Sequence, residues 1–135
     1  MLKKWLLAEH NGTDCKGLDW FDTASLDSIR QLKGVGGDEM VRKVVDLYLS
    51  NSSMLVDDLH TGLAQGDAEA VRQGAHALKS SSQNVGACGL ATLSQQLEEM
   101  GRSGELEDAQ KYMGALDDLY PKTVLALKSA IQQLG

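Results

Sequence analysis

The chain has 135 residues, a net charge of -6, and 42% hydrophobic but only 4% aromatic residues. This length suits one domain with a single core, and the acidic charge argues against a nucleic-acid partner because no basic stripe is available to neutralise phosphates. Few aromatic residues and a single proline favour helices packed through aliphatic side chains.

Residues 1–20 are predicted to be a linker or lead-in, since Asn11 to Asp14 form a breaker cluster. Cys15 and Cys88 match no metal-ligand spacing, and two isolated cysteines are typical of a reducing compartment. The sequence has no signal-peptide pattern and no apolar run near the roughly 18 residues of a membrane span. We therefore expect a monomeric, cytoplasmic domain that makes no membrane contact itself.

Residues 21–135 are predicted to form the folded domain, and its first element is a short helix. Asp22 or Thr23 can cap this helix, and a glycine-rich stretch at 34–37 ends it. Its apolar positions are Leu26, Ile29 and Leu32.

A longer helical pattern follows over residues 38–65, with Asp38 as the expected cap. The apolar phase continues through Val41, Val45, Tyr48, Ser52, Leu55, Leu59 and Leu63. Residues 51–53, Asn-Ser-Ser, could divide the pattern into two helices. The sequence alone leaves one helix or two open.

The next helix is predicted over 67–84, with Asp67 as its cap after Gly66. One buried stripe is expected along it, formed by Val71, Ala75, Leu78, Ser82 and Val85. Because a helix advances about 100° per residue, His76 lies about 140° from the centre of this stripe and should face water. Lys79, one turn on, lies close enough for its ammonium group to reach a group carried on the imidazole.

These residue types suit the transfer of a phosphoryl group. Neutral imidazole has an unperturbed pKa of about 6.5, so the His76 side chain can attack phosphorus near neutral pH without a dedicated base. The ammonium group of Lys79 can stabilise the negative charge on the transferring group. Ser80 is small and leaves room for a second protein to approach.

Gly86 marks a tight turn, and a further helix is predicted over about 87–102. In two antiparallel helices joined there, His76 lies level with Glu98, which can accept a hydrogen bond from one ring nitrogen and leave the other as nucleophile. Gln95 is the alternative partner, and Glu98 could instead be one of many solvated acids.

The last helical pattern covers 105–134, and its apolar phase resumes directly after Pro121, which predicts a kink rather than a break. Its apolar positions are Leu106, Met113, Leu116, Leu119, Val124, Leu127 and Ile131. The predicted fold is all-α, an antiparallel up-and-down four-helix bundle with a short N-terminal capping helix.

The run Ala-His-Ala-Leu-Lys-Ser-Ser at 75–81, followed by Val-Gly-Ala at 85–87, resembles the core motif of bacterial histidine phosphotransfer (HPt) domains. The likeness extends over residues 21–135. It departs from the family at Ser80, where glycine is commonest, and at Glu98, where a glutamine is frequent. The Lys-Lys-Trp-Leu segment at 3–6 is similar to the end of a receiver domain, which suggests the C-terminal module of a hybrid sensor kinase tethered to the inner membrane.

The resemblance implies that His76 accepts a phosphoryl group from a receiver-domain aspartate and passes it to another receiver, with Lys79 as stabilising cation. The partners would be response-regulator receiver domains, in the same polypeptide or separate, and the Mg²⁺ would belong to the receiver. No cofactor is expected in this chain. Besides His76, Lys79 and Glu98, the candidate binding residues are Arg72, Gln73, Ser80, Gln83 and Gln95.

Other functions find little support in the sequence. His10 and His60 lack partners at zinc-ligand intervals, and the acidic pairs at 57–58 and 117–118 are more simply solvated faces. No glycine-rich loop of the nucleotide-binding type is present, so the chain is expected to be a carrier and not an enzyme that uses ATP. The remaining alternative is an adaptor bundle that recruits or inhibits a partner, with phosphorylation secondary.

Overall fold

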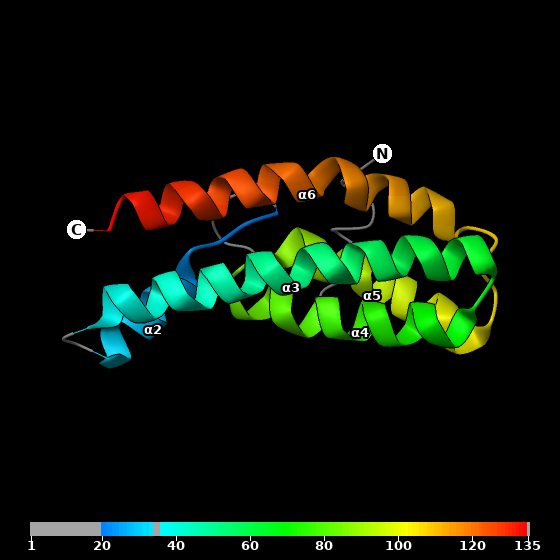
Figure 1. The fold of residues 1–135 in the computed structure, drawn as a ribbon, viewed down its shortest axis with the longest axis horizontal. Helices are drawn as coiled ribbons and strands as arrows, with labels where there is room; N and C mark the ends of the chain where they lie inside the picture. The colour runs from blue at the N-terminus through cyan, green and yellow to red at the C-terminus, as the bar shows by residue number, and fades with distance from the viewer. Residues whose placement is uncertain (1–19, 34–35, 135) are drawn as a thin grey trace.

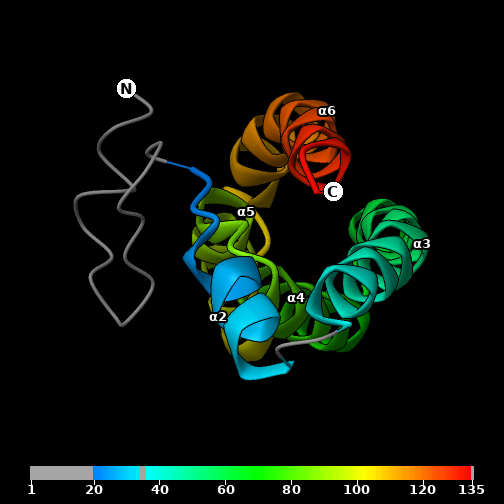
Figure 2. The ribbon, with the colours of Figure 1, turned by 90° about the vertical axis from the view of Figure 1, so that its left-hand side faces the viewer.

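The computed structural model describes residues 20–33 and 36–134, and within them the chain forms five α-helices and no β-strand. The helices are α2 (Ala24–Lys33), α3 (Gly37–Gln65), α4 (Ala68–Asn84), α5 (Cys88–Ser103) and α6 (Ala109–Gln132). The four long helices α3 to α6 run along one axis in alternating directions, and the short α2 covers one end (Figures 1 and 2). The predicted four-helix bundle with an N-terminal capping helix is confirmed.

Local capping groups fix the start of α4 as the sequence predicts. The side chain of Asp67 accepts a hydrogen bond from the backbone N–H of Ala70 at 3.1 Å, and Gly66 ends α3 with a φ of +65°. A similar contact opens α2, where the carboxylate of Asp22 accepts the N–H of Ala24 at 2.9 Å. These short-range contacts set where the chain reverses, and therefore which residues of α4 face outward.

The start of α3 differs from the prediction. Gly36, with a φ of +87°, precedes the first residue of the helix, and no side chain caps it. The carboxylate of Asp38 instead accepts a hydrogen bond from Nε of Arg30 at 2.5 Å. The expected cap at Asp38 is wrong because this side chain joins α3 to α2.

The segment between residues 37 and 65 is one continuous helix, which resolves the choice that the sequence left open. Ser52, in the middle of the Asn-Ser-Ser run, is fully buried and shares a hydrogen bond of 2.7 Å with the hydroxyl of Tyr120 on α6. Tyr48, one turn earlier, makes a 2.8 Å hydrogen bond to Ser82 on α4. Tertiary contacts from two neighbouring helices therefore keep α3 intact.

Helix α6 begins at Ala109, four residues after the predicted start at Glu105. It continues through Pro121 without a break, as expected, and Pro121 itself is exposed. The proline lacks an N–H, so the carbonyl group four residues earlier loses its helical partner. The exposed position explains why the helix tolerates this loss, since water can satisfy that carbonyl.

The core is aliphatic, and the predicted stripe of α4 belongs to it. Its largest fully buried side chains are Leu59, Leu78, Leu90, Leu93, Leu97, Met113, Leu116 and Leu127, together with four valines. Leu55, Leu63, Leu106, Leu119 and Ile131 are half-buried at the edge of this core, and Val124 is half-buried without packing against it. The interior is apolar apart from a few hydroxyls and one carboxylate, and that carboxylate belongs to the site described below.

The end of the bundle next to α2 is closed by backbone contacts around the α4–α5 turn. The N–H of Asp22 donates to the carbonyl of Gly86 at 2.9 Å, and the N–H of Gly89 donates to Trp20 at 3.1 Å. Gly86 has a φ of +80°, and a Cβ there would collide with the carbonyl oxygen of Asp22, so glycine is required. Trp20, assigned to the lead-in, packs against the core, whereas the rest of that segment lies outside the described residues.

Cys88 corrects the interpretation of the cysteines as isolated residues. It is disulfide-bonded, and because it is the only cysteine in 20–33 and 36–134, its partner lies outside the described residues.

Among the described helices, none combines the length and the apolar character that a membrane crossing needs.

Candidate functional site around His76 and Glu98

His76 lies in the middle of α4 with its side chain 59% exposed, as its phase in the helix predicts. Its Nδ1 lies 2.9 Å from Oε2 of Glu98 on α5. The register expected from the turn at Gly86 is therefore observed, and Nδ1 is bound while the side chain as a whole stays mostly exposed. When Nδ1 holds the proton and donates it, Nε2 carries the free lone pair.

Glu98 is the buried acid of this site, and its side chain is only 4% exposed. Oε1 accepts from Nζ of Lys79 at 2.8 Å, and Oε2 accepts from Nη2 of Arg102 at 3.1 Å as well as facing the imidazole. Burial acts to raise the pKa of this carboxyl, but the hydrogen bonds from Lys79 and His76 outweigh it and hold the pKa below its usual value. Glu98 is thus an ionised buried acid and not a solvated surface one.

Lys79 takes a different position from the expected one. Its side chain is only 23% exposed, because the ammonium group turns towards Glu98 instead of extending into water. The cation is still one helical turn from His76, and both side chains contact the same carboxylate. Lys79 is therefore fixed beside the imidazole.

Arg102, which was not predicted as a site residue, completes the group around Glu98. It stands four residues after Glu98 on α5, the spacing at which oppositely charged side chains meet on a helix. That spacing is visible in the sequence, but its meaning depends on the burial of Glu98, which the sequence left open. The site thus gathers one carboxylate, two cations and one imidazole from two helices.

The other predicted binding residues lie around this group but are not all free. The side chains of Arg72 and Gln73 both donate to Glu69, and those bonds lower the pKa of Glu69 to about 2. Gln95, the alternative partner for the imidazole, binds Glu99 at 3.3 Å instead.

Ser80 and Gln83 occupy the exposed side of α4. Ser80 follows His76 by one turn, and the backbone carbonyl of Gln83 accepts a hydrogen bond from Ser25 of α2 at 3.4 Å. Because Ser80 is exposed, its side chain is available to a docking protein. The hydrogen bond from Ser25 fixes the backbone of Gln83 relative to the capping helix α2.

Possible metal ligands outside this site are dispersed over the described part of the chain. No three of its His, Cys, Asp or Glu residues lie close enough together to hold a metal ion. His60 of α3 pairs with Asp117 of α6 at 2.8 Å, and both side chains are exposed. His10 lies outside the described residues.

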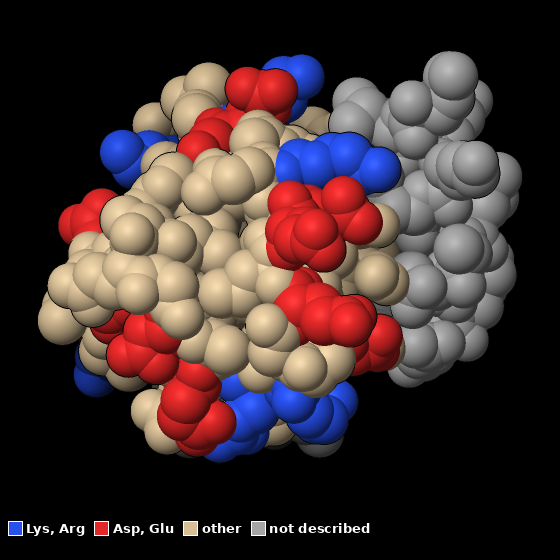
Figure 3. Space-filling view, turned by 90° about the vertical axis from the view of Figure 1, so that its right-hand side faces the viewer, with Lys and Arg blue, Asp and Glu red and all other residues tan. Residues whose placement is uncertain are grey.

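Among the charged side chains at the end of the bundle opposite α2, acidic ones predominate (Figure 3). Figure 3 shows this end, where acidic side chains gather in several places and basic ones in smaller groups. The exposed acids of the two turns there are Asp67, Glu69, Glu105, Glu107 and Asp108. This face offers no continuous basic surface for a polyanion.

Comparisons with known proteins find similarity to a family and to a solved structure. A family model described as "Hpt domain" matches residues 43–135. The crystal structure of histidine-containing phosphotransfer protein B (HptB) from Pseudomonas aeruginosa PAO1 is similar, with a TM-score of 0.77 and 27% sequence identity over 88% of this chain and 100% of that one. No curated protein sequence matches.

Proposed function

The chain belongs to the Hpt domain family, and from this premise we propose that His76 is the residue that carries the phosphoryl group. The function of the domain is histidine phosphotransfer in a phosphorelay. Hpt domains carry phosphoryl groups between receiver domains of response regulators and have no ATP site of their own. What remains to be assigned is the role of each side chain.

The observation that supports His76 is its contact with Glu98. The 2.9 Å contact at Nδ1 fixes the plane of the ring and favours the tautomer in which Nδ1 bears the proton. Nε2 is then an exposed nucleophile held on a rigid helix. The other described histidine, His60, lacks this arrangement, since its bound nitrogen is Nε2.

The transfer step follows from this geometry. The lone pair of Nε2 attacks the phosphorus of a receiver's aspartyl phosphate in line, and the N–P bond forms as the P–O bond to the aspartate breaks. The bonding electrons leave with the aspartate carboxylate. The proton stays on Nδ1, where the negative charge of Glu98 compensates the positive charge that develops on the ring. Delivery to a second receiver is the same step in reverse.

Lys79 supplies positive charge close to the transferring group. Its ammonium group is held 2.8 Å from Oε1 of Glu98, so little side-chain freedom is lost when it turns to the phosphoryl oxygens. The Mg²⁺ and the aspartate belong to the receiver in this scheme. The domain therefore acts as a carrier whose own contribution is an oriented imidazole and a fixed cation.

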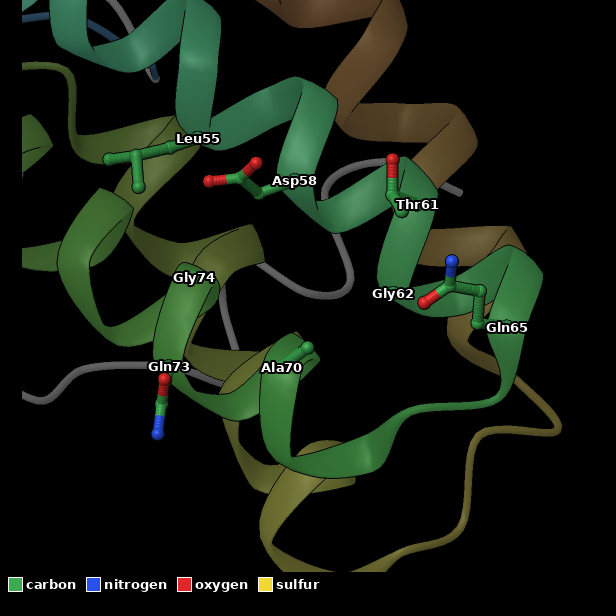
Figure 4. A pocket seen from close by; sticks show the side chains of 8 residues that line it. All are labelled: Leu55, Asp58, Thr61, Gly62, Gln65, Ala70, Gln73 and Gly74. Atoms are coloured by element: carbon green, nitrogen blue, oxygen red, sulfur yellow. The ribbon is translucent and has the colours of Figure 1, made fainter.

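A receiver docking over His76 would also cover the groove between α3 and α4. This groove has a volume of about 360 Å³. Figure 4 shows its lining, formed by Leu55, Asp58, Thr61, Gly62 and Gln65 of α3 and Ala70, Gln73 and Gly74 of α4. Gln73 stands one turn before His76, so the groove and the imidazole lie on neighbouring parts of one surface.

Two exposed apolar side chains on α3 extend this surface. Leu47 is 66% exposed and Met54 is 64% exposed. They are spaced seven residues apart, and Thr61 of the groove follows after seven more, so all three share one face of the helix. A small apolar centre with a polar rim suits a transient contact with a receiver domain. We propose that the domain is monomeric when it binds the receiver. The receiver can belong to the same polypeptide or to a separate one.

The phosphoacceptor is tested by substitution of His76. Incubation with a phosphorylated receiver should label the wild-type domain with phosphate that is lost in acid and retained in alkali, and His76→Gln should take up none. Because His76 is exposed, the variant should keep the wild-type circular dichroism spectrum. Label that persists on His76→Gln would rule out this assignment, and His60→Gln serves as the matched control that should label normally.

Lys79→Met should slow the transfer by about tenfold, which corresponds to roughly 1.4 kcal/mol of lost charge stabilisation. Methionine keeps the length of the side chain and its helix propensity, so the helix content should not change. The matched control is Lys128→Met on the exposed surface of α6. Initial rates of label uptake measure the effect, and equal rates in the two variants would remove the electrostatic role of Lys79.

A further inference from the structure

Arg102 shares an acceptor atom with the proposed phosphoacceptor. Its Nη2 lies 3.1 Å from Oε2 of Glu98, and Nδ1 of His76 lies 2.9 Å from the same oxygen. Two contacts of 3.1 and 2.9 Å with one atom place the two nitrogens at most 6.0 Å apart, the sum of the two distances. The guanidinium is therefore a neighbour of the imidazole, although it comes from the other helix.

Arg102 and Lys79 lie on opposite sides of His76 along the bundle axis. Lys79 follows His76 on α4, whereas Arg102 follows Glu98 on α5, which runs in the opposite direction (Figure 1). Each cation has its own oxygen of Glu98, Oε1 for Lys79 and Oε2 for Arg102. Arg72 also stands at the level of Arg102, but its guanidinium is bound to Glu69. The imidazole is thus flanked by two cations that are fixed by one buried acid.

The guanidinium of Arg102 keeps donors for another acceptor. Arginine has five N–H donors in a planar fork, and within the described residues the guanidinium of Arg102 makes a hydrogen bond or ion pair to Glu98 alone. Its side chain is 60% exposed, so the remaining donors face solvent. The fork matches the spacing of phosphate oxygens, which two parallel N–H groups can bind at once.

We propose that Arg102 is a second phosphoryl-binding cation, which contacts the oxygens of the group on Nε2 from the side opposite to Lys79. The inference rests on the proposed role of His76. In the unphosphorylated domain, Glu98 holds both cations next to the ring and balances part of their charge. When the phosphoryl group arrives, its oxygens become additional acceptors for donors that are already in place, and the guanidinium needs only a small rotation.

Phosphoramidate provides a test that needs no partner protein. It transfers its phosphoryl group to an imidazole nitrogen as its own P–N bond breaks and ammonia leaves. The phosphorus NMR signal of the loaded domain is then followed against pH. A cation beside the phosphoryl group favours its dianion and lowers the titration midpoint of that group. Arg102→Met should raise the midpoint by a few tenths of a pH unit, and Arg102→Lys should restore part of the difference.

The matched control is Arg30→Met, which removes an exposed arginine from α2 and should leave the midpoint at the wild-type value. An unchanged midpoint in a labelled Arg102→Met domain would overturn the proposal for Arg102 while leaving His76 as acceptor. If the wild-type domain and His76→Gln gave the same phosphorus signals, the assignment of His76 as the phosphoacceptor would be wrong. If Arg102 only held Glu98 in place, the titration midpoint of the phosphoryl group would be the same in Arg102→Met and in the wild type.

Discussion

Glu98→Leu should lower the rate of phosphoryl transfer through His76 by about 10- to 100-fold, the range known for lost partners of metal-bound histidines. The substitution removes the acceptor at 2.9 Å from Nδ1, so the ring turns freely and either nitrogen can hold the proton. Fewer imidazoles then present a lone pair at Nε2 in the orientation for attack. The rate of label uptake from a phosphorylated receiver measures this loss.

Unfolding should not contribute to the effect of Glu98→Leu. Leucine fills the space of a side chain that is only 4% exposed, and the three partners that lose their acceptor, His76, Lys79 and Arg102, are 59%, 23% and 60% exposed, so they can turn to water and no charge is left buried without a partner. Glu98→Gln is the matched control, because its amide oxygen can still accept from Nδ1 while the charge is lost. It should transfer faster than the leucine variant. Equal rates in wild type and Glu98→Leu would refute the orienting role.

Gly101→Ala should destabilise the bundle by about 1–3 kcal/mol and lower its melting temperature by roughly 5–10 °C. Gly101 is buried on α5 where this helix meets the start of α4. A Cβ there would lie 2.6 Å from the backbone nitrogen of Arg72 and 2.7 Å from the carbonyl oxygen of Ala68. Neither backbone atom can turn away as a side chain would, so the two helices must move apart.

The matched control for this prediction is Gly114→Ala in α6. Nothing lies within 4 Å of a Cβ at Gly114, and the position is exposed and helical. Alanine there should stabilise the protein by about 0.5–1 kcal/mol, because it restricts the unfolded chain and has the higher helix propensity. Thermal unfolding followed by circular dichroism compares the two variants. A melting temperature of Gly101→Ala at or above that of Gly114→Ala would contradict the close approach of α4 and α5.

The separation of α4 and α5 also affects the site. Gly101 stands one turn after Glu98, and the contact between Glu98 and His76 spans the same two helices. Gly101→Ala should therefore slow the transfer as well as lower the stability, although it touches no reacting atom. The Gly114→Ala variant, altered on α6, should transfer at the wild-type rate.

The parts of the site that the sequence predicted depend on local rules. Asp67 and Gly66 define where α4 begins, and from that start the helical period alone places His76 on the exposed side. The short turn at Gly86 then fixes the register between α4 and α5 and brings Glu98 level with His76. Such features need only a few neighbouring residues, so one sequence contains them.

The parts that the sequence did not predict depend on contacts between distant residues. Asp38 looked like a helix cap, but its carboxylate is used by Arg30 on another helix. Residues 51–53 have weak helix propensity, and α3 remains whole because Ser52 bonds to Tyr120, 68 positions along the chain. Local propensity gives no information on such partners.

Long charged side chains set a further limit. A helical projection gives the direction of the Cβ of Lys79, but four more carbon and nitrogen atoms follow, and they turn back to Glu98. Arg102 was missed for a related reason, since its spacing from Glu98 gained meaning only when Glu98 was known to be buried. The electrostatic part of the site therefore needed coordinates.

Glu98 holds Nδ1 of His76, and Nε2 is therefore the atom expected to accept the phosphoryl group. The direct measurement is the position of the phosphorus on the ring, read from nitrogen–phosphorus couplings by NMR after loading from a phosphorylated receiver. A single species is expected, with phosphorus on Nε2 of His76 and a proton on Nδ1. Phosphorus on Nδ1, or on any residue other than His76, would contradict it.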